Sequence, residues 1–326
     1  MRCVVGIDGG GTKTACAIAT PEGAALGHAV GGPSNYQTVG AAATRAALEG
    51  VLREAAQRAG WARAAGGPLE VTGLCLALAG VDRPADRRAI TQIVADLLSR
   101  PVEGLRWALE ASRVVVVNDA VAALVGGVGR KVGVVTVAGT GSIAFGRNAR
   151  GEERRAGGWG YLLGDEGSGY AIGLAALRAV CRAADGRGPA TRLTEHVLRE
   201  HRLAQPSDLI AKAYGAWQVP DIAALAPLVE RAASEGDAVA RAVLDAAAAE
   251  LALAAGAVIR GLQMAETPVD VVTVGGVWAG APRVNEQFAA QVRSLAPLAR
   301  VVRPRDEPVA GAVLLARESI GTACLD

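Results

Sequence analysis

The stretch CVVGIDGGGTKTACAIA (residues 3–19) carries most of the information about the fold. Residues 3–7 and 14–19 predict strands, and a third strand is expected at 25–30. The glycine turn between the first two strands gathers backbone N–H groups into one concavity, and such a nest binds phosphate oxygens. A single triple-glycine turn is also compatible with an ordinary hairpin, so this motif alone does not establish a function.

A second turn of the same kind, Ala138-Gly139-Thr140-Gly141-Ser142, joins strands expected at 132–137 and 142–147. Two equivalent turns indicate phosphate binding far more specifically than one. The spacing also fits a loose dinucleotide fingerprint, but that site needs a helix to open at the turn, and residues 143–146 continue as strand. No Gly-x-x-x-x-Gly-Lys-Ser/Thr sequence occurs, so the chain is not a P-loop protein.

The two halves of the chain follow one plan, in which three strands are followed by helix, strand, helix, strand and helix. This predicts an α/β fold with an internal structural repeat. We expect a first lobe over 1–118 and a second over 119–307, with a helical insertion at 190–262 and a C-terminal helix in 308–326 that packs back on the first lobe. Further strands are expected at 69–78, 113–117 (a β-branched run, hence buried), 269–274 and 299–302, and helices at 40–59, 85–99, 237–262, 283–296 and 308–321.

Composition argues against several classes of protein. The net charge is +2 without a long basic run, which disfavours nucleic-acid binding. No signal peptide is apparent and no segment reaches about 20 apolar residues; the closest, 251–259, lies between Glu250 and Arg260. We therefore expect a cytoplasmic protein without a membrane partner. The five cysteines form no Cys-x-x-Cys pair, so neither a zinc site nor a disulfide framework is expected.

Two carboxylates follow predicted strands. Asp8 ends the first strand and is placed to hold Mg²⁺ through water molecules. Asp119 follows the 113–117 strand, where it can accept the proton of an attacking hydroxyl in phosphoryl transfer. The structural alternative is an N-cap for a helix over Ala120–Gly126, and Asp119 could serve both roles.

A third block, Gly157-Gly158-Trp159-Gly160-Tyr161-Leu162-Leu163-Gly164-Asp165-Glu166-Gly167-Ser168-Gly169, fits neither helix nor strand. Loops of this composition usually carry function. Trp159 can pack on the apolar face of a pyranose while Asp165 bonds its hydroxyls. A purely structural glycine loop, with Glu166 facing solvent, is the alternative.

Together these segments resemble the N-acetylglucosamine kinases of the BadF/BadG/BcrA/BcrD ATPase family, over nearly the whole chain. The segments that carry the resemblance are 8–14, 34–35, 79–84, 118–120, 139–142, 157–160 and 164–169. The resemblance implies two ribonuclease-H-like lobes of the actin/hexokinase type, with ATP and sugar in the cleft between them. It also implies Mg²⁺ as cofactor, transfer to the sugar 6-hydroxyl with Asp119 as general base, and a homodimer.

The same resemblance assigns residues to each ligand. Positions matching the nucleotide site are Gly10, Gly11, Thr12, Lys13, Gly139, Thr140, Gly141, Gly275 and Gly276, with Asp8 for the metal. Positions matching the sugar site are Asn35, Asp119, Ser142, Gly158, Trp159, Gly160 and Asp165.

Other activities stay open at this stage. The segment after Asn35 reads Tyr36-Gln37, which differs from mammalian-type enzymes, so glucosamine, N-acetylmuramic acid or a hexose such as glucose are alternative substrates. Some family members are instead ATPase activators of acyl-CoA dehydratases that hold an iron–sulfur cluster through paired cysteines. No such pair occurs near the second turn. A non-catalytic sugar sensor is a third possibility, but it would not need both Asp8 and Asp119.

Overall fold

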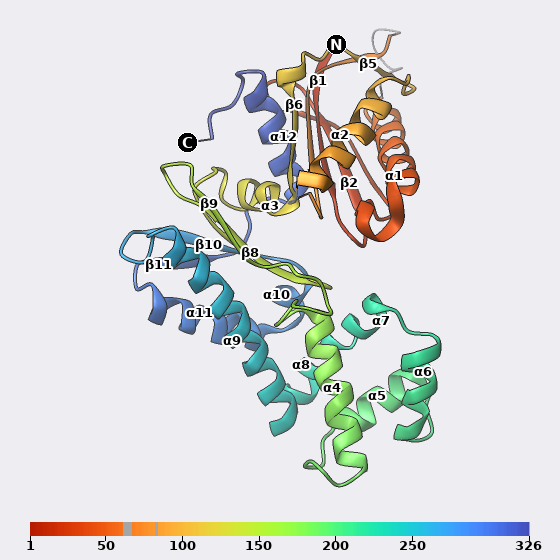
Figure 1. The fold of residues 1–326 in the computed structure, drawn as a ribbon, viewed down its shortest axis with the longest axis vertical. Coiled ribbons are helices and arrows are strands. Elements are labelled where there is room, and N and C mark those ends of the chain that lie inside the picture. The colour runs from red at the N-terminus through yellow and green to blue at the C-terminus, as the bar shows by residue number, and fades with distance from the viewer. Residues whose placement is uncertain (61–66, 82–83, 326) are drawn as a thin grey trace. The chain divides into compact units, whose positions relative to one another are not determined.

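The computed structural model describes residues 1–60, 67–81 and 84–325, and it divides into two compact units (Figure 1). Unit 1 comprises Met1–Val132 and Pro304–Asp326, and unit 2 comprises Gly133–Arg303. Asp82 and Arg83, part of the 79–84 motif, lie outside the described residues.

Unit 1 contains a mixed sheet in the order β3-β2-β1-β4-β5, with β6 also paired to β4. β1 pairs antiparallel with β2 and parallel with β4, as expected for a meander followed by a crossover. β5 and β6 pair with successive parts of β4, at Leu69–Val71 and Leu74–Leu78. The strands are β1 (Arg2–Gly9), β2 (Thr14–Ala19), β3 (Ala25–Gly31), β4 (Leu69–Leu78), β5 (Leu105–Trp107) and β6 (Val114–Asn118).

Helices cover both faces of this sheet. Along β1 the side chains alternate between two apolar clusters, since Val5 and Ile7 join the α1–α2 side and Val4 joins the α12 side. Figure 1 shows α1 and α2 on one side of the strands and α12 on the other. The helices of unit 1 are α1 (Tyr36–Arg58, kinked at Gly40), α2 (Pro84–Leu98), α3 (Asp119–Val128) and α12 (Pro308–Ser319), with a 3₁₀ turn at Ala111–Arg113.

The C-terminal helix α12 packs tightly on α3 and crosses β1 and β4. Small residues allow this approach. A Cβ built at Gly311 would lie 2.0 Å from Ala122 O, and one at Gly6 would lie 2.4 Å from Val313 N. Because α3 is held to α12 in this way, the units divide after Val132, later than the 118/119 boundary expected from the sequence.

Replacing Gly311 with alanine is expected to destabilise unit 1 by about 1–3 kcal/mol, because the added methyl group must displace the α3 backbone. The matched control is Gly50→Ala in α1, where a Cβ meets no atom within 4 Å. There the helical preference of alanine should stabilise by about 0.5–1 kcal/mol. Urea unfolding of both variants measures the difference. Equal unfolding midpoints for Gly311→Ala and the parent would refute the close approach.

Unit 2 repeats the strand plan with the sheet order β11-β10-β7-β8-β9. β7 pairs antiparallel with β8 and parallel with β10, which corresponds to the role of β1 in unit 1. Its strands are β7 (Gly133–Ala138), β8 (Ser142–Arg147), β9 (Glu153–Gly157), β10 (Val269–Val274) and β11 (Ala299–Val302). Its helices are α4 (Gly169–Ala184), α5 (Leu193–His201), α6 (Leu209–Gly215), α7 (Val219–Ala223), α8 (Ala226–Ser234), α9 (Ala238–Gly261), α10 (Gly276–Gly280) and α11 (Pro282–Leu295), with a 3₁₀ turn at Pro206–Asp208.

Helix α9 is the long helix of the predicted insertion. Asp237 caps it, accepting the Ala240 N–H at 2.8 Å, as the sequence predicted. Among the described residues it is the one helix long and apolar enough to cross a membrane, and half of its most apolar window is buried. It packs on β8, β9 and α11, so the core of unit 2 accounts for its apolar composition.

Two local expectations differ from the structure. The short strand β5 was not predicted, since three residues are too few to show a period. The β-branched strand β6 was expected to be buried, yet all five residues are only half-buried. The reason is that β6 pairs with a single strand, β4, so no second strand covers its other edge within the described residues.

Candidate active site

The first part of the candidate site lies at the carboxyl ends of β1, β4 and β6 in unit 1. The three strands are parallel, Asp8 pairs with Ala77, and Leu78 pairs with Asn118. Asp119 follows directly as the first residue of α3. The fold therefore brings Asp8 and Asp119 to one edge of the sheet, although 110 positions separate them in sequence.

The ionised form of the Asp8 carboxylate is disfavoured in this position. Burial, followed by the negative charge of Asp119, raises its pKa from 3.8 to about 7, with a further contribution from Glu307 and opposition from Lys13. Desolvation and like charges both favour the protonated form. A cation bound at this edge would offset that repulsion, so the residues present fit a magnesium ion.

The Gly9–Lys13 turn is closed by backbone hydrogen bonds. Gly10 N donates to Lys13 O at 3.0 Å, and Gly10 O accepts from Ser34 N and Asn35 N at 3.0 and 3.2 Å. Within the described part of the chain, the amides of Gly11 and Thr12 donate to no protein acceptor. Thr12 and Lys13 are exposed. The turn thus has the donor arrangement of an anion-binding nest.

Asn35 lies beside this turn, at the start of α1. Its Oδ1 caps the helix by accepting Gln37 N at 3.1 Å, and Gln37 Nε2 donates to Gly80 O at 3.2 Å. Asn35 and the glycine turn therefore form one local structure, joined through Gly10 O. This places the predicted sugar residue Asn35 next to the predicted phosphate residues.

The N-cap position of α3, considered above for Asp119, belongs to the residue before it. Asn118 is the N-cap of α3, and its side chain accepts from Ala120 N at 2.9 Å. Asp119 Oδ1 also accepts from that N–H at 2.9 Å, and the carboxylate is half-buried. Since the cap is supplied by its neighbour, the helix does not require an acid at 119.

The second turn occupies the corresponding place in unit 2, between β7 and β8. Gly139 N donates to Gly141 O at 2.9 Å, in the same way that Gly10 N donates across the first turn. The amides of Thr140 and Gly141 donate to no acceptor in the described residues. Each unit therefore carries one glycine turn with backbone donors left for a ligand.

Gly275 and Gly276, predicted for the nucleotide, follow β10, and Gly275 lies against this second turn. A Cβ at Gly275, whose φ is 119°, would lie 2.4 Å from Ala138 O. Only glycine allows both that backbone conformation and that approach. The next helix, α10, is anchored by Trp278, whose Nε1 donates to Thr136 O at 3.1 Å.

The loop from Gly157 to Gly169 divides into two parts. Gly158, Trp159 and Gly160 are exposed, Trp159 to 64%, and the Arg155 guanidinium lies 5.3 Å from the centroid of the Trp159 ring. Asp165 is half-buried instead and faces the second turn, where its Oδ1 accepts Ser142 N at 3.1 Å. Ser142 is nearly buried, and its hydroxyl donates to Glu166 O at 2.7 Å.

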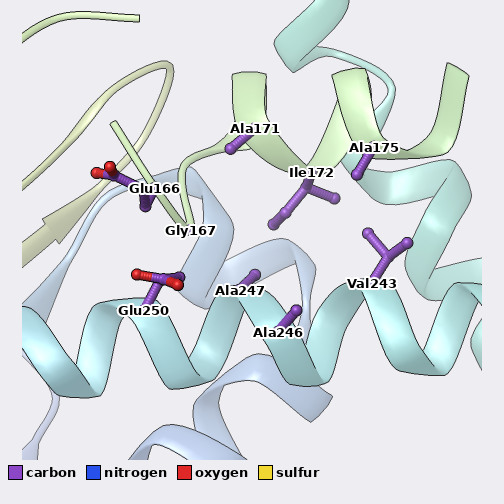
Figure 2. Close-up of a pocket in the computed structure, with 9 residues that line it drawn as sticks. All are labelled: Glu166, Gly167, Ala171, Ile172, Ala175, Val243, Ala246, Ala247 and Glu250. Atoms are coloured by element: carbon purple, nitrogen blue, oxygen red, sulfur yellow. The ribbon is translucent and has the colours of Figure 1, made fainter. Parts of the chain in front are cut away.

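Two hollows adjoin this loop. Ser142 and Trp159, both predicted for the sugar, line a hollow of about 280 Å³ between β8 and α9. Figure 2 shows its neighbour of about 190 Å³, where Ala, Ile and Val side chains from α4 and α9 form the walls and the Glu166 and Glu250 side chains lie at one end. Glu166 is exposed, as the structural interpretation of this loop expected.

Three residues near the turns were not assigned from the sequence. Ser34 is fully buried and hydrogen-bonded to Thr14 Oγ1 at 2.8 Å, which ties the first turn to Asn35. Ser168 caps α4 beside the second turn by accepting from Ala171 N. Glu307 acts on Asp8 from the start of α12. Only Ser168 had a local signal, a serine directly before a helical pattern.

Comparison with known proteins supports the assignment of the family. A model of the BadF/BadG/BcrA/BcrD ATPase family matches residues 5–316. An N-acetylmuramic acid/N-acetylglucosamine kinase of Clostridium acetobutylicum is 33% identical over 318 residues, covering 97% of this chain and 99% of the relative. An N-acetyl-D-glucosamine kinase of Dictyostelium discoideum is 34% identical over 323 residues, covering 97% and 98%.

A crystal structure from Chromobacterium violaceum, assigned as an N-acetylglucosamine kinase, is also similar. It superposes with a TM-score of 0.76 at 29% identity, covering 97% of this chain and 99% of that one. The predicted α/β class with two lobes of the actin/hexokinase type is confirmed. From the family match and the two relatives above 30% identity, we conclude that the chain belongs to the BadF/BadG/BcrA/BcrD ATPase family.

Proposed function

We propose that this protein is a sugar kinase that transfers the γ-phosphoryl group of ATP to the 6-hydroxyl of an amino sugar, with N-acetylglucosamine as the favoured substrate. The observation that carries the proposal is that Asp8 and Asp119 lie at one edge of the sheet, beside a glycine turn whose Gly11 and Thr12 amides have no acceptor among the described residues. Both relatives above 30% identity are named as kinases of N-acetylglucosamine or of the related N-acetylmuramic acid.

In this proposal the two turns hold the phosphates of ATP. Gly10, Gly11, Thr12 and Lys13 belong to unit 1, and Gly139, Thr140 and Gly141 belong to unit 2 with the adjoining Gly275 and Gly276. Asp8 would hold Mg²⁺ through water, in keeping with the ion's preference for few protein ligands. The ion supplies neutralisation of phosphate charge.

Asp119 is the proposed general base. Its carboxylate stands at the end of β6, half-buried and not required as the helix cap, so it can accept the proton of the attacking hydroxyl. The sugar is expected to contact Asn35 in unit 1 and the following residues in unit 2: Ser142, Gly158, Trp159, Gly160 and Asp165. The exposed Trp159 ring offers an apolar face of the kind that stacks on pyranoses.

The oligomeric state and the cellular compartment are part of the same proposal. We expect a homodimer in the cytoplasm that binds a small-molecule substrate. The buried thiols Cys3, Cys16 and Cys75 and the exposed thiol Cys181 form no disulfide, which supports a reducing compartment.

Coupled measurement of ADP release tests the proposal with a panel of N-acetylglucosamine, N-acetylmuramic acid, glucosamine and glucose. We expect ADP release to depend on added sugar and kcat/KM to be highest for N-acetylglucosamine. If another sugar gives the highest kcat/KM, the activity stands and the proposed substrate is wrong. ATP hydrolysis that no sugar stimulates would instead favour an ATPase activator of another enzyme.

A further inference from the structure

Residues 165–170, which follow the exposed part of the glycine loop, are hydrogen-bonded directly to the second turn, residues 139–142. Four hydrogen bonds join them within unit 2. Their donors and acceptors are Ser142 N to Asp165 Oδ1 (3.1 Å), Ser142 Oγ to Glu166 O (2.7 Å), Gly169 N to Gly139 O (2.8 Å) and Tyr170 N to Thr140 O (3.3 Å). Every residue of the Gly139–Ser142 turn except Gly141 therefore has a partner in this segment.

Gly141 contacts the segment in a different way. A Cβ built on it would lie 2.8 Å from Asp165 Oδ2 and 3.0 Å from Asp165 Cγ. The carboxylate therefore packs directly against the Gly141 backbone while its other oxygen takes the Ser142 N–H. Asp165 thus contacts the turn through both of its oxygens.

Asp165 has a left-handed backbone conformation. Its φ is 60°, one of three positive values among the non-glycine residues described. A left-handed conformation costs an ordinary side chain about 1 kcal/mol or more, and it persists where surrounding contacts demand it. At Asp165 this conformation coincides with the contacts to the turn, because the same residue reaches Ser142 N and Gly141.

We propose that Asp165 is a positioning residue for the nucleotide: by fixing Ser142 N–H and packing on Gly141, it holds the second turn in its phosphate-binding shape. This role goes beyond a contact to sugar hydroxyls, and it rests on the proposed nucleotide function of the turn. Since Ser142 N–H is taken by Asp165 and Gly139 N–H by Gly141 O, the amides of Thr140 and Gly141 are the donors left for phosphate.

Calorimetric titration of the whole protein with Mg·ADP, without any sugar, separates this role from sugar contact. Asp165→Ala is expected to raise the Kd of Mg·ADP roughly tenfold, as the loss of a charge-assisted hydrogen bond would. Asp165→Asn, which keeps an acceptor oxygen and tolerates positive φ, should remain within about threefold of the parent. Asp165→Gly removes the acceptor and the strain together, so it should fold normally and still bind Mg·ADP weakly.

The matched control is Glu166→Gln. The neighbouring Glu166 bonds Ser142 through its backbone carbonyl, and its carboxylate is exposed, so Mg·ADP affinity should not change. An unchanged Kd in both Asp165→Ala and Asp165→Gly, with only the KM for sugar affected, would overturn the proposal.

These measurements distinguish failure of the positioning role from failure of the sugar kinase proposal. If the parent phosphorylates no sugar but its Mg·ADP affinity still depends on Asp165, the positioning role stands and the sugar kinase proposal fails. If the parent does not bind Mg·ADP at all, both are contradicted.

Discussion

Asp119→Asn is expected to lower kcat by roughly 10²-fold or more while leaving Mg·ADP affinity nearly unchanged. The amide keeps the shape of the side chain but cannot take the proton of the attacking hydroxyl. The helix should survive the change, because Asn118 supplies the N-cap of α3. Steady-state kinetics with saturating ATP and sugar, together with titration of Mg·ADP, measure the two quantities separately.

The control for this variant is Asn118→Ser, which exchanges one good N-cap for another. It should retain most of the parent kcat and the parent melting temperature. If Asp119→Asn turned over like the parent, Asp119 could not be the base. If it lost nucleotide binding together with turnover, the effect would be one of local folding.

Asp8→Asn is expected to abolish sugar phosphorylation and yet to stabilise the nucleotide-free protein at pH 8. The activity is lost because the proposed Mg²⁺ ligand is lost. The stability rises because a buried charge is removed: burial and the charge of Asp119 hold the pKa of Asp8 at about 7 in the folded protein, against 3.8 as the reference value.

The sign of the pH dependence follows from this difference. Between pH 4 and 7 the folded protein keeps a proton that the unfolded chain releases, so the free energy of unfolding falls as pH rises through this window and levels off above 7. A shift of this size corresponds to at most about 4 kcal/mol. The gain from Asp8→Asn should therefore be largest at pH 8 and should vanish below pH 4.

Urea unfolding at pH 5 and pH 8, without magnesium or nucleotide, measures this gain. Asp270→Asn is a useful comparison, because Asp270 is paired with Arg300 at 2.8 Å and its removal should not stabilise. If Asp8→Asn lowered stability at pH 8, the carboxylate would have to be well compensated in the folded state, and the account of a cation site would lose its basis.

Much of the fold could be predicted because its signals are local. The strands at 14–19, 69–78, 142–147, 269–274 and 299–302 agree with the structure residue for residue, since each is a short, mainly apolar segment bounded by turn residues. The N-cap of α9 at Asp237 could also be predicted from its local sequence. Both glycine turns lie where their sequences placed them, between two antiparallel strands.

Contacts between segments that lie far apart along the chain could not be predicted from the sequence. The boundary after Val132 depends on the packing of α3 on α12, which begins nearly 200 residues later. The contact of Asp165 with Ser142, and the charge of Glu307 near Asp8, also arise only when separate segments come together. The residues of the candidate site were accessible through their motifs, but the partners that tune them were not.

The most direct test of the central claim is identification of the product formed from Mg·ATP and N-acetylglucosamine. Mass spectrometry and phosphorus NMR of the reaction mixture can report both the transfer and the position of the phosphate. The account predicts stoichiometric ADP and an N-acetylglucosamine phosphate whose phosphorus couples to the two protons on carbon 6. Inorganic phosphate as the only phosphorylated product besides ADP, with the sugar unchanged, would contradict it.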